Sequence, residues 1–456
     1  MKIFNTLSGK KEDFVPLEKN KIKMYVCGMT VYDDTHIGHA RTFLSFDLIV
    51  RYLRSINYEV HYIRNITDVD DKIISRAEEL NITPKELTKK YINSMNDDFN
   101  SLGMIEPDSE PRATDNIDSI ISLIKILIKK GHAYEGSSDV YFSAESFDSY
   151  GKLSRRNLED MLAGARVDID TDKKNPADFV LWKKNTEGLK WDSPWGEGRP
   201  GWHIECSAMS MDALGETFDI HGGGSDLKFP HHENEIAQSE CVTGKEFAKL
   251  WMHTGSLRID KEKMSKSLKN FVTIKDALQT HSSEVLRLFL ISSHYRSPLN
   301  YSHDGLEEAK HSLDRLYNSL QDLVYESKDY IQTEYSQKFH KAMQDDFNTP
   351  SALSVLFEMA RHINTLKKEN NIEKSSSLAK ELVTLSDILG LLQGSPDKHF
   401  TEGIGTSDEE IEGYILMRNQ ARNNKDFDLA DKIRDELLEK GIVLEDKESG
   451  TTWKKS

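Results

Sequence analysis

Hydrophobic residues near the N-terminus follow first a strand pattern, then a helix pattern, then a strand pattern again. Lys21–Cys27 alternates polar and apolar positions and ends at a Gly28 turn. Apolar residues recur at helical spacing across Gly38–Ile56, and Tyr58–Arg64 again has the pattern of a strand. A strand, a crossover helix and a second strand predict a parallel sheet. Ligands of such sheets bind beyond the carboxyl ends of the strands, so we expect functional residues just after Cys27.

Strand and helix patterns continue in an order that predicts an insertion. Asp115–Lys130 is apolar at helical spacing and stops at Gly131. From His132 to about Pro200, short strands with Gly and Trp predict an inserted module. Further elements are predicted at Thr83–Glu86 (a capping box that opens a helix), Phe218–Ile220 and Trp251–Arg258 (strands), and Thr273–Ser293 (helical).

The chain changes character after His303, where leucines spaced three and four apart predict helices packed in a bundle. A linker with Gly, Ser and Pro, Gly394–Ser407, precedes a small terminal module. The fold class predicted is therefore α/β: a Rossmann-type parallel-sheet catalytic domain with an insertion, followed by an α-helical bundle and a small C-terminal module. The predicted ranges are 1–115 and 200–258 for the sheet domain, 116–199 for the inserted module, 259–302 for a loop and linking helices, 303–394 for the bundle and 395–456 for the linker and terminal module.

Composition narrows the class of protein. Of 456 residues, 37% are hydrophobic and 30% charged, which excludes a disordered polymer. No segment approaches the roughly 18–20 apolar residues of a membrane span, and the N-terminus lacks the apolar core of a signal peptide. Three cysteines cannot form a disulfide framework, so they indicate a reducing compartment and metal or thiol chemistry. We expect a multidomain cytoplasmic protein without a membrane partner.

The net charge of −16 argues against indiscriminate binding of polyanions, but leaves a local basic surface possible. Residues 401–456 contain 9 Lys and Arg against 14 Asp and Glu, so an RNA-binding face there would have to be local. Candidates for RNA contact in that region are Arg418, Arg422, Lys425 and Trp453.

The tetrapeptide His36-Ile37-Gly38-His39 lies where the first helix should begin. Helix N-termini present free N–H groups and a positive dipole end, which suits phosphate. His36 and His39 are three residues apart and are expected on one helical face, while Gly38 lets a flat base approach closely. The alternative is a pair of surface histidines beside a glycine at the helix start.

A second motif, Lys263-Met264-Ser265-Lys266-Ser267, follows more than 220 residues later. Its small polar residues and lysines predict a cationic loop that can close on a polyphosphate and stabilise charge on the α-phosphate and pyrophosphate. The alternative is a solvated basic loop.

Two cysteines, a histidine and a glutamate suggest a metal site. Cys27 closes the first strand, and Cys206 ends the segment that begins at Pro200. If His231 or the proline before it opens a helix, His231 and Glu235 project from the same face. This borderline-soft set suits Zn²⁺. The alternatives are two inert buried thiols beside a surface helix, and His232 as ligand in place of His231; Cys241 is expected to be buried and inert.

Together the two motifs resemble the paired signatures of class I aminoacyl-tRNA synthetases letter for letter. Gly224-Ser225-Asp226 resembles the element that this class places near the adenosine ribose. The most specific resemblance, to the cysteinyl-tRNA synthetases, covers nearly the whole chain and is carried by Met24–His39, Asn65–Ile73, Pro200–Ser207, His221–Glu235 and Lys263–Ser267.

The resemblance implies an ATP-dependent ligase of protein biosynthesis. It would activate L-cysteine with ATP and Mg²⁺, then transfer it to tRNA(Cys). By the same resemblance, one Zn²⁺ per chain is held by Cys27, Cys206, His231 and Glu235 and binds the substrate's thiol. A monomer is also expected.

The resemblance further suggests roles for single residues. His36 and His39 would orient phosphate, with Gly38 beside ATP, and Lys263 and Lys266 would stabilise the transition state, Lys266 being the nearer to ATP. Weaker candidates for the substrate pocket or the ribose are Thr67, Trp202, His221 and Asp226; their alternatives are a helix-cap Thr, a core Trp, a structural His and a turn-capping Asp.

Two other functions remain open at this point. One is an ATP-dependent ligase that joins cysteine to a small amine; the helical region after Ser267 argues against it, because that reaction needs no tRNA contact. The other is a zinc-stabilised RNA-binding protein without catalysis, which would need none of His36, His39, Lys263 and Lys266.

Overall fold

The computed structural model describes residues 1–156, 172–184, 188–259, 262–263, 271–325, 332–401, 408–439, 441–447 and 450–455. The chain divides into two compact units. The first comprises Met1–Leu313, Gln332–Leu356 and Ile388–Leu391; the second comprises Asp314–Ile331, Phe357–Asp387 and Leu392–Ser456. The finer ranges derived from the sequence stay predictions.

A four-stranded parallel sheet forms the centre of the first unit, as the sequence pattern predicts. Its strand order is β10–β9–β3–β4, with β3 at Lys21–Val26, β4 at Glu59–Arg64, β9 at Phe218–Gly224 and β10 at Ala248–Thr254. The chain leaves β3 for β4 on one side and later enters β9 on the other. The strand order therefore reverses between β3 and β9, which is where open α/β sheets bind their ligands.

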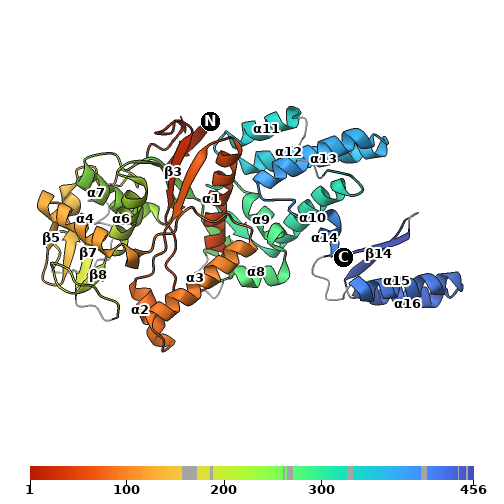
Figure 1. Cartoon of the computed structure of the whole chain (residues 1–456), viewed down its shortest axis with the longest axis horizontal. Helices are drawn as coiled ribbons and strands as arrows, with labels where there is room; N and C mark the ends of the chain where they lie inside the picture. The colour runs from red at the N-terminus through yellow and green to blue at the C-terminus, as the bar shows by residue number, and fades with distance from the viewer. Residues whose placement is uncertain are drawn as a thin grey trace. The chain divides into compact units, whose positions relative to one another are not determined.

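The crossover between β3 and β4 is the long helix α1 (Ile37–Ser55), which the sequence places at 38–56. Its apolar residues, among them Phe43, Leu44, Leu48 and Ile49, are buried, because helical spacing collects them on one side. Figure 1 shows β3 and α1 next to each other in the middle of the first unit.

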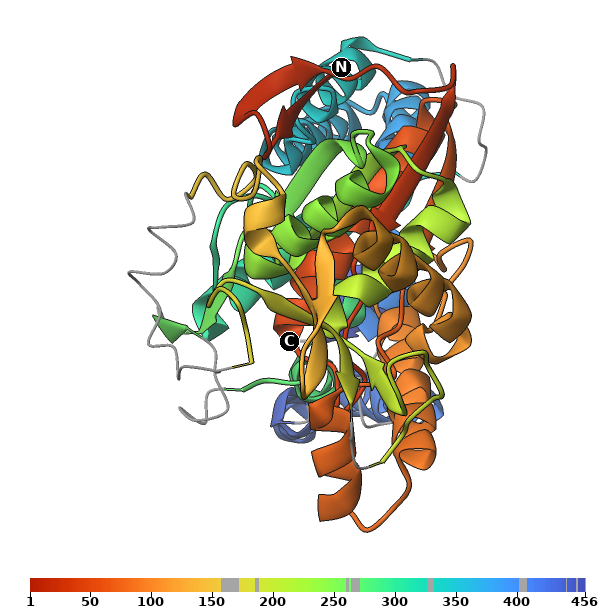
Figure 2. The same ribbon diagram turned by 90° about the vertical axis from the view of Figure 1, so that its left-hand side faces the viewer.

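A second, antiparallel sheet follows α4 (Ile117–Lys130). Its strands run in the order β5–β6–β7–β8, at Ala133–Glu135, Asp139–Phe142, Phe179–Lys184 and Gly198–Pro200. Gly131 ends α4 in the left-handed conformation, with φ 81°, which glycine adopts without strain. Figure 2 turns this sheet toward the viewer.

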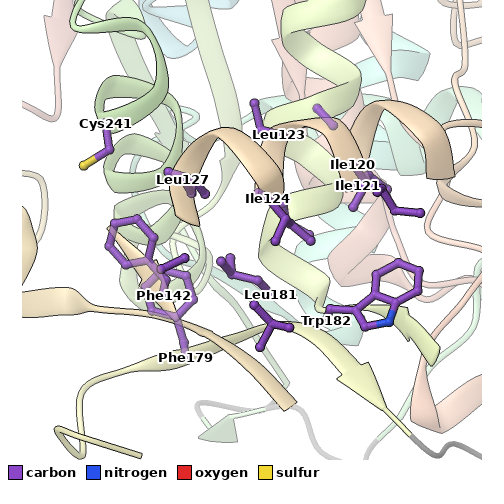
Figure 3. Packing of buried hydrophobic residues seen from close by; sticks show 14 of the residues in the cluster. Ile120, Ile121, Leu123, Ile124, Leu127, Phe142, Phe179, Leu181, Trp182 and Cys241 are labelled. Atoms are coloured by element: carbon purple, nitrogen blue, oxygen red, sulfur yellow. The ribbon is translucent and has the colours of Figure 1, made fainter. Parts of the chain in front are cut away.

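The hydrophobic core between this sheet and the helices is drawn in Figure 3. α4 contributes Ile120, Ile124 and Leu127, which pack with Leu181 and Trp182 of β7. Helices α6 (Trp202–Leu214) and α7 (Glu233–Thr243) complete the same cluster through Ile204, Ala208, Ala237 and Cys241.

The third cysteine belongs to this cluster. Cys241 is 8% exposed and packs among apolar side chains. Burial raises the pKa of its thiol to about 12, so the thiol stays protonated near neutral pH. A buried, unreactive thiol is the interpretation that the sequence favours for Cys241, and the environment agrees with it.

The single helical segment predicted at 273–293 is two helices, α8 (Ile274–Thr280) and α9 (Ser283–Ile291). The break occurs because the Ser282 side chain accepts a hydrogen bond from the Val285 amide and begins a new helix. Other elements of the first unit are β1 (Lys2–Asn5), β2 (Lys10–Asp13), α2 (Asp71–Glu79), α3 (Pro84–Ser101), η1 (Ala113–Asp115), η2 (Ala144–Ser146), η3 (Lys228–His232), β11 (Leu257–Ile259), β12 (Glu262–Lys263), β13 (Leu299–Tyr301) and α11 (Glu334–Met343).

The remaining elements are helical, apart from one hairpin. The leucine series that predicts the bundle extends from Leu306 to Leu323, three residues beyond the end of α10 (His303–Leu320). These elements are α10 (His303–Leu320), α12 (Thr349–Lys368), α13 (Ile372–Ile388), α14 (Pro396–Thr401), α15 (Asp408–Asn423), α16 (Phe427–Glu439), β14 (Ile442–Lys447) and β15 (Gly450–Lys455).

The terminal module has a small core of its own, in which isoleucines of α15, α16 and β14 pack together. Trp453 packs against this core. The guanidinium groups of Arg418 and Arg422 lie 2.9 and 2.8 Å from the carboxylate of Asp446. Three of the four suggested RNA-contact residues therefore make contacts within the module. Across the described part of the chain, no helix is both long and apolar enough to cross a membrane.

Candidate functional site

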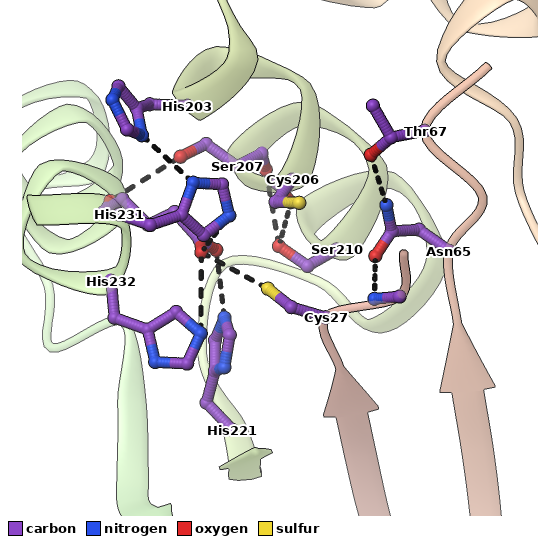
Figure 4. A network of polar contacts seen from close by, with 12 residues as sticks. Cys27, Asn65, Thr67, His203, Cys206, Ser207, Ser210, His221, His231 and His232 are labelled. Atoms are coloured by element: carbon purple, nitrogen blue, oxygen red, sulfur yellow. Dashed lines mark hydrogen bonds and ion pairs between the residues drawn. The ribbon is translucent and has the colours of Figure 1, made fainter. Parts of the chain in front are cut away.

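Four side chains from three regions of the sequence converge at the carboxyl edge of the parallel sheet (Figure 4). Cys27 follows the last residue of β3, Cys206 lies on α6, His231 lies in the η3 turn, and Glu235 lies in the first turn of α7. All four are buried, and their potential ligand atoms lie within 4.8 Å of one another. The structure thus brings together the four residues proposed from the sequence as metal ligands.

The contacts within this group centre on the carboxylate. Glu235 Oε1 lies 3.3 Å from Cys27 Sγ and 3.1 Å from His231 Nε2. The sequence places a helix start at residue 230 or 231, but the turn begins at Lys228 and α7 itself begins at Glu233. The spacing of four still brings His231 against Glu235, because the η3 turn runs directly into α7.

A second group overlaps the first and contains Cys27, His221, His232 and Glu235. His221 Nε2 lies 2.8 Å from Glu235 Oε2, whereas His232 Nε2 lies 3.9 Å from Glu235 Oε1. His232 Nδ1 shares a hydrogen bond of 2.9 Å with His253 Nε2. Among the described residues, only the first group contains two thiols, so it is the softer donor set and the one better suited to Zn²⁺.

The electrostatics of the centre favour a bound cation. Burial lowers the pKa of His231 to about 3, so this imidazole is neutral, as a metal ligand must be. Burial raises the pKa of the Cys27 thiol well above its usual range, so the thiol ionises only if a positive charge compensates. Burial opposes ionisation of Glu235 too, but its neighbours His221 and His231 outweigh burial and lower its pKa.

Several buried polar atoms around the centre make no hydrogen bond in the described part of the chain. They are the Tyr25 hydroxyl, His221 Nδ1 and His232 Nε2. Buried polar atoms are normally paired, so unpaired ones around a thiol-rich cluster are consistent with a site that binds a ligand. The donor set, its burial and these atoms together fit Zn²⁺.

Two of the predicted pocket residues touch the metal group directly. The Trp202 ring stacks on His231 with centroids 4.2 Å apart, and the His221 ring stacks on Trp251 at 4.3 Å. Trp202 is 38% exposed while His221 is fully buried, so Trp202 connects the centre with solvent. His203 Nδ1 lies 2.8 Å from His231 Nδ1, which leaves Nε2 of His231 directed at the metal group.

Thr67 lies next to Cys27 through a short hydrogen-bonded bridge. The Gly28 amide donates to Asn65 Oδ1 at 2.8 Å, and Asn65 Nδ2 donates to the buried Thr67 hydroxyl at 3.3 Å. A Cβ atom on Gly28 would lie 1.7 Å from the Asn65 carbonyl oxygen, so only glycine fits there. Asn65 was not singled out from the sequence, although it begins one of the segments that carry the resemblance.

His36 and His39 form a closed local arrangement at the start of α1. His36 is the N-cap residue rather than a helical residue, with φ −115° and ψ 166°. Its side chain accepts from the His39 amide at 3.2 Å, and the His39 side chain accepts from the His36 amide at 3.4 Å. The two rings stack with centroids 3.5 Å apart. The expected common helical face is therefore replaced by a reciprocal cap, and Gly38 lies inside it.

The chain after the second motif returns to this cap. His36 and Thr273 form an antiparallel bridge, and the Ile37 amide donates to the Val272 carbonyl at 3.1 Å. Lys263 is the last residue of β12, which pairs with β11. Lys266 lies outside the described residues. The start of α1 is therefore held by the backbone of residues 272–273, which follow the second motif by five residues in the sequence.

Asp226 follows the carboxyl end of β9, on the same edge of the sheet as Cys27. It is exposed, and a Cβ atom on Gly224 would lie 2.4 Å from its Oδ1 atom. The position agrees with a contact to a ligand beyond the strand ends, and the sugar contact itself stays a prediction.

A further group of possible ligands lies elsewhere, at His281, His303 and Glu307. It contains no thiol, and His303 is exposed. His281 Nε2 lies 3.1 Å from Glu307 Oε1, a contact that a simple hydrogen bond between α8 and α10 explains.

Sequence comparisons agree along the whole chain. Residues 13–311 match the family described as tRNA synthetases class I (C) catalytic domain, and residues 338–393 match the DALR domain. The chain is 54% identical to the cysteine–tRNA ligase of Hahella chejuensis over 467 residues, covering all of both chains. It is 55% identical to the cysteine–tRNA ligase of Haemophilus influenzae over 460 residues, again covering all of both.

Solved structures show the same fold at low identity. Mycobacterium tuberculosis methionyl-tRNA synthetase in complex with methionyl-adenylate matches with a TM-score of 0.60 at 13% identity, covering 81% of this chain and 89% of that one. A LeuRS from Agrobacterium radiobacter, in a ternary complex, matches with a TM-score of 0.59 at 11% identity, covering 90% and 94%. These two likenesses establish the architecture alone.

Proposed function

The chain belongs to the cysteine–tRNA ligases, a family of class I tRNA synthetases, and from this premise we propose that Cys27, Cys206, His231 and Glu235 bind one Zn²⁺ ion that recognises the thiol of L-cysteine. The observation that carries the proposal is the buried group of two thiols, an imidazole and a carboxylate at the carboxyl edge of the sheet. A cysteine-specific enzyme has to recognise sulfur, and a soft donor set prepares a metal for that task.

The family reaction has two steps. A carboxylate oxygen of cysteine attacks the α-phosphorus of ATP, the bond to pyrophosphate breaks, and cysteinyl-adenylate forms. A terminal ribose hydroxyl of tRNA then attacks the carbonyl carbon of the adenylate and releases AMP. Neither step needs a protein nucleophile, so positioning and charge stabilisation supply most of the acceleration.

Selection of cysteine against serine has to distinguish sulfur from oxygen, because the two substrates are otherwise alike. A pocket that senses only size discriminates by about 10- to 200-fold. When bound, Zn²⁺ supplies a soft Lewis acid that prefers a thiolate to a neutral hydroxyl. Trp202, partly exposed and stacked on His231, and Thr67, near Cys27, would hold the rest of the amino acid.

The two signature motifs would handle the nucleotide. The reciprocal cap fixes the rings of His36 and His39 at the positive end of α1, where they and the N–H groups around Gly38 would orient the phosphates of ATP and its Mg²⁺. Lys263 and Lys266 would stabilise the charge that develops on departing pyrophosphate, and Asp226 would contact the ribose.

The acceptor is tRNA rather than a small amine. The DALR domain match at residues 338–393 and the full-length similarity to cysteine–tRNA ligases support this choice, since transfer to a small amine needs no such region. An RNA-binding protein without catalysis is disfavoured because His36 and His39 are present in an ordered cap. A monomeric state and a cytoplasmic location stay predictions.

Three measurements on the full chain test the proposal. Zinc content should be about one ion per chain, cysteine should support ATP–pyrophosphate exchange, and labelled cysteine should become attached to tRNA(Cys). Exchange without transfer would support the small-amine ligase, and absence of exchange would support the binding protein. If a chain that binds no zinc still catalyses cysteine-dependent pyrophosphate exchange, only the proposed role of the metal would be overturned.

A further inference from the structure

The Tyr25 side chain lies beside the metal group without an assigned role. Tyr25 and Cys27 are two residues apart at the end of β3, so their side chains are on the same face of the sheet. Tyr25 is fully buried in the same cluster as Cys27 and Cys206, and its ring lies 5.4 Å from that of His221. Its hydroxyl has no hydrogen-bond partner among the described residues.

An unpaired buried hydroxyl is costly. Leaving one unsatisfied costs about 1–3 kcal/mol, so phenylalanine would make a more stable core at this position. A tyrosine hydroxyl ordinarily loses its proton only near pH 10. The hydroxyl therefore keeps its proton and can act as a donor. A thiol is a weak acceptor for such a donor, whereas a metal-bound thiolate is a good one.

His231 and Glu235 already have outer partners. His203 Nδ1 lies 2.8 Å from Nδ1 of His231, and His221 Nε2 lies 2.8 Å from Glu235 Oε2. Cys27 Sγ contacts Glu235, which is itself one of the four proposed ligands. Metal ligands are usually held by such outer hydrogen bonds, which orient them and adjust their donor strength. Of the two thiol ligands that share a cluster with Tyr25, Cys206 is the one toward which the Tyr25 side chain is placed to donate.

We propose that Tyr25 is a positioning residue of the metal centre, whose hydroxyl donates a hydrogen bond to the Cys206 thiolate when Zn²⁺ is bound. The inference rests on the proposed zinc site. The hydrogen bond would stabilise the negative charge of the Cys206 sulfur in its buried surroundings and so favour the ionised form that binds a metal. It would also fix the orientation of that sulfur. The proton stays on Tyr25 throughout.

The test compares Tyr25→Phe with the wild type as full-length, zinc-loaded proteins. Competition with a chelator should show zinc affinity reduced by roughly 10- to 100-fold, the usual loss when an outer partner is removed. With Co²⁺ in place of zinc, the thiolate-to-cobalt absorption band should shift, because one sulfur loses its hydrogen bond.

Tyr62→Phe is the matched control. Tyr62 is also buried, on the neighbouring strand β4, but it pairs with Met24 and so lies on the opposite face of the sheet from Tyr25. Removal of its hydroxyl should leave zinc affinity and the cobalt band unchanged.

Thermal unfolding of the metal-free chains distinguishes a role of Tyr25 at the metal centre from a role in general stability of the fold. Tyr25→Phe removes an unpaired hydroxyl there, so its melting temperature should equal or exceed that of the wild type. A melting temperature lowered to the same extent with and without zinc would overturn the inference. Equal zinc affinity of Tyr25→Phe and the wild type would also overturn the inference about Tyr25. That result would not contradict the zinc site itself. Absence of zinc from the wild type would instead overturn the proposed function.

Discussion

Two buried clusters share the helices α6 and α7, and they differ in what their side chains contribute. On one face, Ala237 and Cys241 of α7 pack among leucines, isoleucines and aromatic rings (Figure 3). On another, Glu235 of α7 and Cys206 of α6 meet imidazoles and a second thiol (Figure 4). The side chains named in both clusters are buried, so burial alone does not distinguish a core from a site.

The distinction lies in how the buried atoms are stabilised. The hydrophobic cluster gains free energy from every apolar group that it removes from water, and this gain offsets the Trp182 Nε1 atom within it, which is unpaired among the described residues. The polar cluster retains unpaired atoms, such as His221 Nδ1 and His232 Nε2, each of which costs about 1–3 kcal/mol. Another interaction must offset the cost of these unpaired atoms. The donor set indicates that this interaction is the binding of a metal. The same residue type, cysteine, thus has two roles within the two helices.

The sharpest test of this contrast exchanges one cysteine in each cluster. Cys206→Ser should lose nearly all bound zinc and should lower cysteine-dependent pyrophosphate exchange by at least about 100-fold, because a hydroxyl is a poor ligand for Zn²⁺. Cys241→Ser should keep about one zinc per chain. Metal analysis and exchange assays on both variants provide the measurement. Retention of zinc by Cys206→Ser, or its loss from Cys241→Ser, would erase the contrast.

A truncation in the hydrophobic cluster should give the opposite pattern. Leu181 is fully buried in β7, and Leu181→Ala should reduce the free energy of unfolding by about 2–5 kcal/mol through the cavity that it leaves. Zinc affinity per folded molecule should stay the same. Chemical denaturation gives the first quantity and chelator competition the second. A matched drop in zinc affinity would mean that the two clusters are one energetic unit.

A smaller effect on stability is expected at the start of α1, where two variants of His36 distinguish its capping role from a role in catalysis. His36→Ala removes an N-cap and should cost about 1 kcal/mol of stability, whereas His36→Asn keeps a capping side chain and should cost less. If the imidazole orients ATP, both variants should slow adenylate formation in single-turnover assays. Normal adenylation by His36→Asn would assign the ring to capping only.

The smallest effect concerns the pH dependence of stability. Burial raises the pKa of Cys241 to about 12, whereas an unfolded thiol titrates near about 8.5. Above pH 8.5 the unfolded chain releases a proton that the folded chain keeps, so stability falls as pH rises. Between pH 8.5 and 9.5 the loss should be under about 1 kcal/mol. Denaturation of zinc-loaded wild type and Cys241→Ala at both pH values should show a shallower slope in the variant. Equal pH dependence of stability in the two proteins would show that the buried Cys241 thiol is not the source of the loss.

The sequence predicts those features that depend on neighbouring residues. The parallel sheet, the helix after Cys27 and the helix end at Gly131 follow from local periodicity and turn chemistry, and the structure confirms them. The spacing of His231 and Glu235 likewise predicts their contact. What fails locally is the exact helix start, because histidine is not a preferred N-cap residue and His36 gave no such signal.

Other features depend on contacts between distant segments and have no local signal. His203, His253 and Tyr25 lie around the metal group from α6, β10 and β3, and Asn65 lies there in the loop after β4. Each is an ordinary residue in its own segment, and only the reversal of strand order between β3 and β9 brings them together. The roles of the metal-group residues stay predictions until a ligand is bound.

Because α7 contributes side chains to both clusters, insertions and deletions within this helix should not be tolerated. Glu235 and Cys241 are six positions apart on α7, and at about 100° per residue their side chains point roughly 120° apart. A single inserted codon between them would rotate everything beyond it by about 100°, carrying the thiol out of the core while Glu235 stayed in place. Insertions and deletions should therefore be excluded from this helix and tolerated after Gly244, whose left-handed backbone already ends it.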